Sequence, residues 1–164
     1  MRAAGTDVQW VLNAAGSSYT SGGFEAAWPG DDAVDIVSLD LFQNEAFAST
    51  TDFSAAGGAL QWLEAVGAAR GKLIAVDETS VSFRVRNARQ VGGQDNDLWF
   101  RSLRAWSDRV VDDGQLHHVL AFEADPSPTD LFAPVFPRHP AVSTFPEARQ
   151  DLIDSFGGPR PPEP

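Results

Sequence analysis

A carboxylate follows one of the most apolar runs of this chain, and a carboxylate in that position can act as a catalytic group. Residues 73–76 are all apolar, and Asp77 and Glu78 come directly after them. A fully buried parallel strand is such a run, and an ionised side chain is tolerated only where the run leaves the core. In barrels of parallel strands, that exit carries the active site. Glu78 is therefore our candidate catalytic carboxylate. The alternative is that Asp77 and Glu78 cap the next loop or lie in solvent.

The same unit recurs along the chain, which predicts the elements that would position these groups. Apolar runs ending in polar side chains also occupy residues 8–13, 33–40 and 117–123. Between the runs, apolar residues recur at intervals of three and four, and this spacing predicts helices over residues 52–70, 95–111 and 145–156. The segment between Asn13 and Asp32 predicts a long loop with a short helix around residues 24–28. Strands that alternate with helices indicate parallel βαβ units with right-handed crossovers.

The predicted fold class is α/β, of the (β/α)8 TIM-barrel type, with about four βα units present. A closed barrel of this type needs about 250 residues, whereas this chain has 164. A half-barrel would expose two parallel strand edges and its inner face. Residues 1–5 resemble the end of a helix with a glycine stop, as in a chain that begins inside an element. We expect residues 1–156 to form the half-barrel domain and the Pro/Gly-rich residues 157–164 to form a disordered tail.

Composition excludes several classes of partner. The chain has 23 acidic and 12 basic residues and a net charge of −11, so we expect no nucleic acid partner. No stretch approaches the length of a membrane span, and the N-terminus lacks the apolar segment of a signal peptide. The chain has no cysteine, so disulfides and thiolate metal sites are excluded. We expect no membrane partner.

Two polar clusters have simpler explanations than a metal site. His117, His118 and His139 do not have metal-ligand spacing, and we expect one of the adjacent pair to face the core and the other to face a helix. Residues 94–97 resemble the start of a calcium loop, but they directly precede a helical run, so Asp95 or its neighbour is better explained as a helix N-cap. We expect no metal and no cofactor.

Five motifs, in this order and spacing, carry a resemblance to a known family. They are WVLN at residues 10–13, WPGDDAVDIVSLD at 28–40, the strand that ends at Glu78, GGQDN at 92–96 before a helix with Trp106, and HVLAFEAD at 118–125. Together they resemble the C-terminal half of glycoside hydrolase family 26, the β-mannanase type of (β/α)8 barrel, over nearly the whole chain up to Gly157. The resemblance makes the four predicted strands the fifth to eighth, so that the last four βα units are present.

The resemblance implies a retaining glycoside hydrolase that acts on β-linked, mannan-like polysaccharide or oligosaccharide, and a secreted or extracellular parent protein. Glu78 would be the nucleophile, and a second carboxylic acid about 5–5.5 Å away would protonate the leaving oxygen. Six further residues would line the sugar cleft: Trp10, Asn13, Asp40, Phe42, Phe122 and Asp125. Each also has a structural alternative, because aromatic residues of this kind commonly fill a barrel core. The polar ones commonly cap loops or bond neighbouring strand ends.

The chain departs from the family's pattern in the other half of the site. The family's acid/base glutamate follows a histidine, and this sequence has no His-Glu pair. Glu45, Glu123 and Asp125 are available carboxylates, but nothing in their context marks a replacement. Phe42 stands where the family has a tyrosine whose hydroxyl orients the nucleophile, and residues 79–80 replace the usual Trp-Gly. We therefore expect the isolated chain to be inactive as a glycosidase.

These departures leave three hypotheses. The chain is the nucleophile half of a hydrolase whose N-terminal half-barrel lies elsewhere, or it is a non-catalytic remnant that binds carbohydrate. The third possibility is an unrelated α/β domain that self-associates and buries its strand edges between subunits. Dependence on a partner would favour the first hypothesis. Sugar binding by a stable monomer would favour the second, and a stable homodimer without sugar affinity would favour the third.

Overall fold

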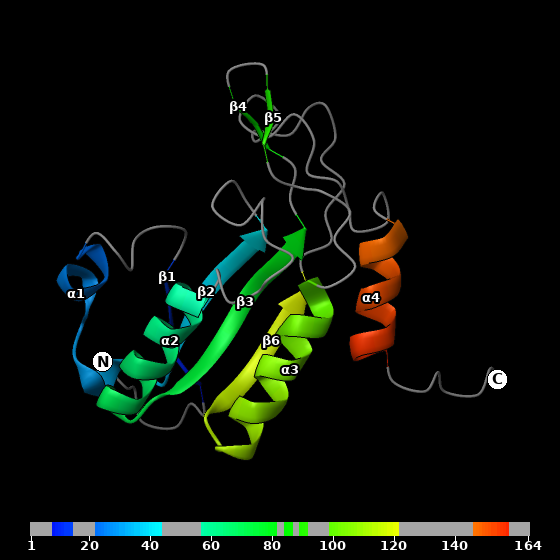
Figure 1. Cartoon of the computed structure of the whole chain (residues 1–164). Helices are drawn as coiled ribbons and strands as arrows, with labels where there is room; N and C mark the ends of the chain where they lie inside the picture. The colour runs from blue at the N-terminus through cyan, green and yellow to red at the C-terminus, as the bar shows by residue number, and fades with distance from the viewer. Residues whose placement is uncertain are drawn as a thin grey trace. The chain divides into compact units, whose positions relative to one another are not determined.

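The fold combines a four-stranded parallel sheet with helices (Figure 1). The computed structural model describes residues 8–14, 22–43, 57–81, 84–86, 89–91, 99–121 and 146–157. The described residues belong to two compact units, each of which has its own packing. Residues 1–5, the cap expected near Asp95 and the tail 158–164 lie outside the described residues.

The sheet of the first unit contains the four strands that the apolar runs predict. They are β1 (Val11–Ala14), β2 (Ile36–Gln43), β3 (Leu73–Val81) and β6 (Leu116–Ala121), in the order β1-β2-β3-β6. β1 pairs with β2 and β3 pairs with β6 in parallel, and the arrows of β2 and β3 run the same way in Figure 1. Parallel neighbours joined through helices confirm the predicted α/β class.

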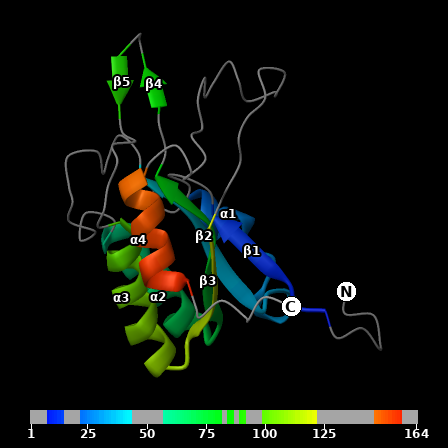
Figure 2. The same cartoon turned by 90° about the vertical axis from the view of Figure 1, so that its right-hand side faces the viewer.

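One face of this sheet packs against α2 (Gly57–Arg70). The apolar side chains of β2 and β3 on this face are covered, and Val37, Leu39 and Val76 are at most 1% exposed. Leu60 and Leu63 are the buried leucines of α2, also fully or nearly fully covered. Figure 2 shows this helix on one side of the sheet. The predicted helix over residues 52–70 is thus confirmed in its described part.

The connection from β1 to β2 contains the expected short helix, α1 (Gly23–Ala27), and then the 3-10 turn η1 (Asp31–Ala33). Phe24 is buried, and its ring meets the Trp62 ring of α2 edge-on at 4.8 Å between centroids. The Arg70 guanidinium lies 4.0 Å from the centre of the Trp28 ring. These contacts attach α1 to the helix layer and leave the other face of the sheet to the polar groups described below.

The second unit contains a hairpin and a helix pair, one helix of which continues into the first unit from Arg109. β4 (Arg84–Arg86) and β5 (Arg89–Val91) are antiparallel, a hairpin that the apolar runs did not predict. α3 (Trp99–Asp112) and α4 (Pro146–Phe156) confirm the predicted helices. The side chain of Asp151 on α4 is buried and accepts the backbone N–H of Arg101 at 2.8 Å. It therefore satisfies one of the unpaired N–H groups in the first turns of α3, where a negative charge is also favoured by the helix dipole.

No helix in the described ranges is both long and apolar enough to cross a membrane.

Substitution of Gly67 tests the close packing of α2 on β3. A Cβ at this buried helix position would collide with Cγ2 of Ile74 and lie 3.2 Å from the carbonyl oxygen of Lys72. Gly67→Ala should therefore lower the free energy of unfolding by about 1–3 kcal/mol, the usual cost of overpacking. Gly58→Ala is the matched control, since nothing lies within 4 Å of its Cβ, and it should gain about 0.5–1 kcal/mol. Urea unfolding of both variants measures the difference, and equal stabilities would contradict the packing.

Candidate functional site

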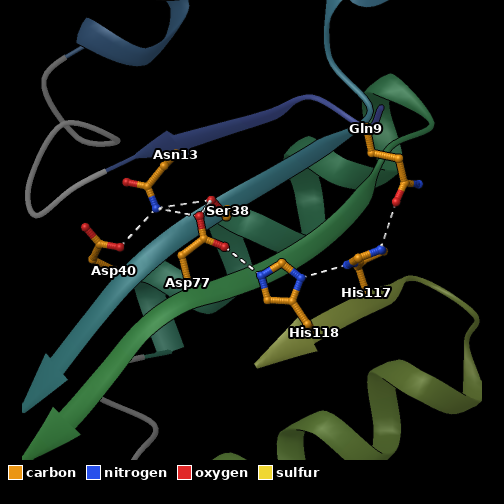
Figure 3. A network of polar contacts seen from close by, with 7 residues as sticks. All are labelled: Gln9, Asn13, Ser38, Asp40, Asp77, His117 and His118. Carbon is orange, nitrogen blue, oxygen red and sulfur yellow. Dashed lines mark hydrogen bonds and ion pairs between the residues drawn. The ribbon is translucent and has the colours of Figure 1, made fainter. Parts of the chain in front are cut away.

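Polar side chains from all four strands meet on the face of the sheet away from α2 (Figure 3). They come from Asn13 on β1, Ser38 and Asp40 on β2, Asp77 on β3, and the two histidines of β6. Successive side chains of a strand point to opposite faces, so Ser38 and Asp40 share a face, and the apolar Val37 and Leu39 lie on the other. We call the set in Figure 3, which also includes Gln9, the sheet network.

Asp77 is the centre of the sheet network. Its Oδ2 accepts hydrogen bonds from the Ser38 hydroxyl at 2.6 Å and from Nδ2 of Asn13 at 3.2 Å. Its Oδ1 lies 2.8 Å from Nε2 of His118. The Asp77 side chain is only 25% exposed, and a carboxylate so placed needs such partners because desolvation penalises the charge. Asp77 therefore does not lie free in solvent, which was one alternative for this residue.

Asn13 extends the network to Asp40, in the second half of β2. Its Nδ2 lies 3.0 Å from Oδ1 of Asp40 and 3.1 Å from Oγ of Ser38, in addition to its contact with Asp77. The amide has two N–H groups and three acceptors, so at least one N–H is shared. Asp40 thus bonds a neighbouring strand end, as its structural alternative predicted, and Asn13 holds two carboxylates close together.

The adjacent histidines both belong to this network, so the expectation that one faces the core and the other a helix is wrong. Nδ1 of His117 lies 2.7 Å from Nδ1 of His118. Ile74 pairs with Leu116 and Ala75 pairs with His118, so His117 is an extra residue of β6 at an irregularity in the register. An extra residue breaks the alternation of side chains. The two rings can therefore meet instead of pointing to opposite faces.

The network crosses the whole sheet. Gln9 precedes β1, and its Oε1 lies 3.2 Å from Nε2 of His117 on β6, the strand at the opposite edge. In a flat sheet, strands three places apart are separated by about 14 Å. A contact between two side chains over this span indicates that the sheet curls toward the network face, as the wall of a barrel does.

Glu78 lies half-buried beside this network, near two other carboxylates. Burial raises the pKa of Glu78 most, and the charges of Asp40 and Asp77 raise it further. The pKa of Asp40 is also raised, by burial first, although its hydrogen bond from Asn13 opposes the shift. The repulsion between Asp40 and Glu78 is mutual. We assign it mainly to Glu78, because an aspartate normally ionises first and the second group then meets its charge.

The structure brings together only some of the residues predicted to line a sugar cleft. Asn13 and Asp40 bond each other beside Glu78, whereas Trp10 is 54% exposed at the start of β1 and does not fill a core. Phe42 continues β2, and its side chain lies outside the described part. Phe122 and Asp125 lie outside the described residues altogether, as do the alternative carboxylates Glu45 and Glu123.

Five network residues were not among the predicted site residues: Gln9, Ser38, Asp77, His117 and His118. A signal for Ser38 is present in the sequence, since Ser38 and Asp40 are the two polar positions within residues 36–42 and are spaced by two. No group of three or more His, Cys, Asp and Glu side chains in the described part of the chain could hold a metal ion.

The chain has an α/β fold that is similar to solved (β/α)8 barrel structures. The catalytic domain of a family 26 endo-β-1,4-mannanase from Bacillus sp. JAMB-750 is 16% identical with a TM-score of 0.52, over 90% of this chain and 37% of that one. A double mutant of the Cellulomonas fimi endo-β-1,4-mannanase is 18% identical with a TM-score of 0.50, over 88% of this chain and 31% of that one. An engineered protein is 17% identical with a TM-score of 0.50, over 88% of this chain and 30% of that one.

The chain thus spans 30% to 37% of the length of these three solved structures. At these identities the similarity concerns the fold alone. No protein-family model and no curated protein sequence matches the chain.

Glu78→Gln should stabilise the protein at neutral pH, and the gain should vanish in acid. The pKa of Glu78 in the folded protein lies above its ordinary value of 4.5. Its contribution to stability is therefore complete below that value and is lost as the pH rises through the raised pKa. Glutamine has no charge to desolvate, so the variant should gain about 0.5 kcal/mol near pH 7, the scale of one relieved like-charge contact. Urea unfolding at about pH 4 and pH 7 measures this gain.

Asp40→Asn provides the partner for a double-mutant cycle. It should act in the same direction, because the pKa of Asp40 is also raised. The double variant should gain less than the sum of the single variants, since the two share one repulsion. A Glu78→Gln protein that is less stable near pH 7 than the wild type would contradict this description of the carboxylates.

Proposed function

We propose that this chain supplies the nucleophile-bearing part of a retaining glycoside hydrolase that acts on β-linked, mannan-like polysaccharide. The observation that carries the proposal is Glu78, a half-buried carboxylate near the C-terminal end of β3. The parallel sheet that holds Glu78 belongs to a fold similar to that of mannanase catalytic domains. Barrel enzymes place catalytic groups at that end of their strands.

In this proposal Glu78 attacks the anomeric carbon and forms a glycosyl ester, which water then hydrolyses. The carboxylate must be ionised to attack. The raised pKa of Glu78 means that it gains a proton more readily than an exposed glutamate does. As the pH is lowered, Glu78 should therefore lose its reactivity at a higher pH than an ordinary carboxylate would. Asn13 and Asp40 would contact sugar hydroxyls beside it, and Trp10, Phe42, Phe122 and Asp125 would extend the cleft.

The acid/base group of the cycle has no evident candidate among the described residues. Both oxygens of Asp77 are occupied within the sheet network, and Asp40 is held by Asn13. The proposal therefore assigns the acid to another segment, such as an N-terminal half-barrel. A general acid contributes about 10²–10⁴-fold, so the chain alone should not turn over polysaccharide. A secreted parent protein belongs to the same proposal.

A self-associating domain is the second candidate, and one observation favours it. Val8, Trp10 and Val11 are exposed at or near β1, and Leu120 is exposed on β6, the two outer strands of the described sheet. Large apolar side chains at strand edges favour burial against another chain. A second copy would serve as well as a missing half-barrel in covering them. A non-catalytic carbohydrate-binding remnant would instead be a stable monomer with sugar affinity.

Covalent trapping tests the role of Glu78 without the missing acid. A 2-deoxy-2-fluoro mannosyl fluoride carries a leaving group that departs without a proton, and its 2-fluorine slows hydrolysis of the ester. We expect the folded chain to gain one sugar mass on the peptide that contains Glu78 and to show no turnover of mannan. Glu78→Gln should take no label. Glu25→Gln, an exposed carboxylate on α1, should take the same label as the wild type.

Two results would count against the proposal. The absence of any label on a folded wild-type chain would mean that Glu78 is not a nucleophile. Turnover of mannan by the 164-residue chain, abolished by Glu78→Ala, would mean that the acid group lies within the chain after all.

A further inference from the structure

Glu78 sits at an irregularity of β3 that it shares with Asp77. Val76 pairs with Val119 and Thr79 pairs with Ala121, so Asp77 and Glu78 together oppose the single residue Leu120. Two residues opposite one is the arrangement of a β-bulge, which commonly re-aims a side chain next to a functional site. The direction of the Glu78 side chain therefore depends on how the backbone at Asp77 is held.

Asp77 is held from three strands. Ser38 on β2 and Asn13 on β1 bond its Oδ2, and His118 on β6 bonds its Oδ1. Because both carboxylate oxygens are occupied, Asp77 is poorly placed to bond a substrate. Among the described residues, Glu78 accepts no such hydrogen bond. Burial raises its pKa most, and repulsion from Asp40 and Asp77 raises it further. The bonded aspartate thus fixes the backbone from which the unbonded glutamate projects.

The proton positions around His118 follow from its neighbours. Its Nε2 faces a carboxylate oxygen of Asp77, so this nitrogen carries a proton. The two Nδ1 atoms of His117 and His118 are 2.7 Å apart, which requires one proton between them. His118 is therefore held on both sides, by a carboxylate and by a second ring. Its N–H is oriented toward Asp77 before any ligand is present.

We propose that Asp77 and His118 are positioning residues for Glu78. The His118 hydrogen bond keeps Asp77 in place, and the fixed bulge holds the Glu78 carboxylate half-buried with the Asp77 charge beside it. The inference deepens the proposed function and rests on it. It assigns the orientation of the nucleophile to a His–Asp pair within the sheet, in a chain that has no tyrosine hydroxyl at residue 42.

Titration of Glu78 is the readout that a merely structural role of His118 would leave unchanged. The titratable groups at this end of the network are Asp40 on β2, Asp77 and Glu78 on β3, and the two histidines of β6; β1 contributes the neutral Asn13. His118→Leu removes the donor to Asp77. A loosened bulge lets water reach Glu78. Because burial is the largest cause of its raised pKa, better solvation should lower the pKa of Glu78 toward its ordinary value.

The experiment follows the side-chain carboxyl ¹³C shift of Glu78 against pH in the full chain. We expect the titration midpoint to fall by about half a unit or more in His118→Leu, well within the range through which one removed partner shifts a carboxyl group. His118→Gln, whose Nε2 can still donate to Asp77, should stay near the wild type. His117→Leu removes a ring that touches His118 but not Asp77, so it should lower the midpoint less than His118→Leu does.

A folded His118→Leu protein with the wild-type midpoint would overturn the proposal. If that variant does not fold, Ser38→Ala removes a different donor from the same carboxylate and decides by the same criterion. The titration needs no substrate, so it is independent of the trapping experiment. If the titration midpoints shift as predicted but trapping gives no covalent label, the proposed function is refuted and the positioning role is not. If trapping gives the label but the midpoints stay unchanged, the positioning role is refuted and the proposed function is not.

Discussion

The half-buried carboxylate of Asp77 is the constraint on which the rest of the site depends. A charge in that place costs free energy unless donors surround it. The donors come from Asn13, Ser38 and His118, on the three other strands of the sheet. Each strand must therefore keep its register with β3, because a slip of one residue would move its polar side chain to the opposite face. The apolar core on the α2 side sets the same register independently, and agreement between the two faces is typical of a well-specified fold.

The same arrangement places three carboxylates near one end of the sheet. Asp40 and Asp77 accept hydrogen bonds, whereas Glu78 lies among their charges and is partly desolvated. Burial and the charges of Asp40 and Asp77 all disfavour the ionised form of Glu78 in the folded protein. Such unfavourable positions are characteristic of functional sites, where reactivity is kept at the expense of stability. The similarity to mannanase catalytic domains concerns the fold alone, and the described residues give Glu78 a defined environment.

Much of the fold could be predicted from the apolar runs. They indicated all four strands, the three longer helices and the short helix near Phe24, because a buried parallel strand and an amphipathic helix have distinct patterns. β3 continues to Val81, so Glu78 lies within the strand, whereas the apolar run had indicated a position at its end. The hairpin β4–β5 was not predicted, since its strands are only three residues long and rich in arginine. Asp151 looks like a surface residue of a helix, and only the packing of α4 against α3 reveals that it is buried.

The site was predicted less completely, for a physical reason. An alternating pattern cannot show an extra residue in a strand, so His117 and His118 were assigned to opposite sides although the irregularity of β6 brings their rings together. The same limitation concealed Asp77, which looked like a loop cap and is instead bonded from three strands. Hydrogen bonds between side chains far apart in sequence depend on the curl and register of the sheet. A local sequence pattern predicts neither of them.

The protonation of the His118 ring tests the central role of Asp77 most directly. Long-range ¹H–¹⁵N correlation spectra of the folded chain at neutral pH report which ring nitrogen carries a proton. We predict that Nε2 of His118 is protonated and hydrogen-bonded, that a single proton joins the two Nδ1 atoms, and that Asp77→Asn abolishes this pattern. A His118 ring with a bare Nε2, or with the averaged shifts of a ring exchanging freely in solvent, would mean that Asp77 does not hold the strands together in this way.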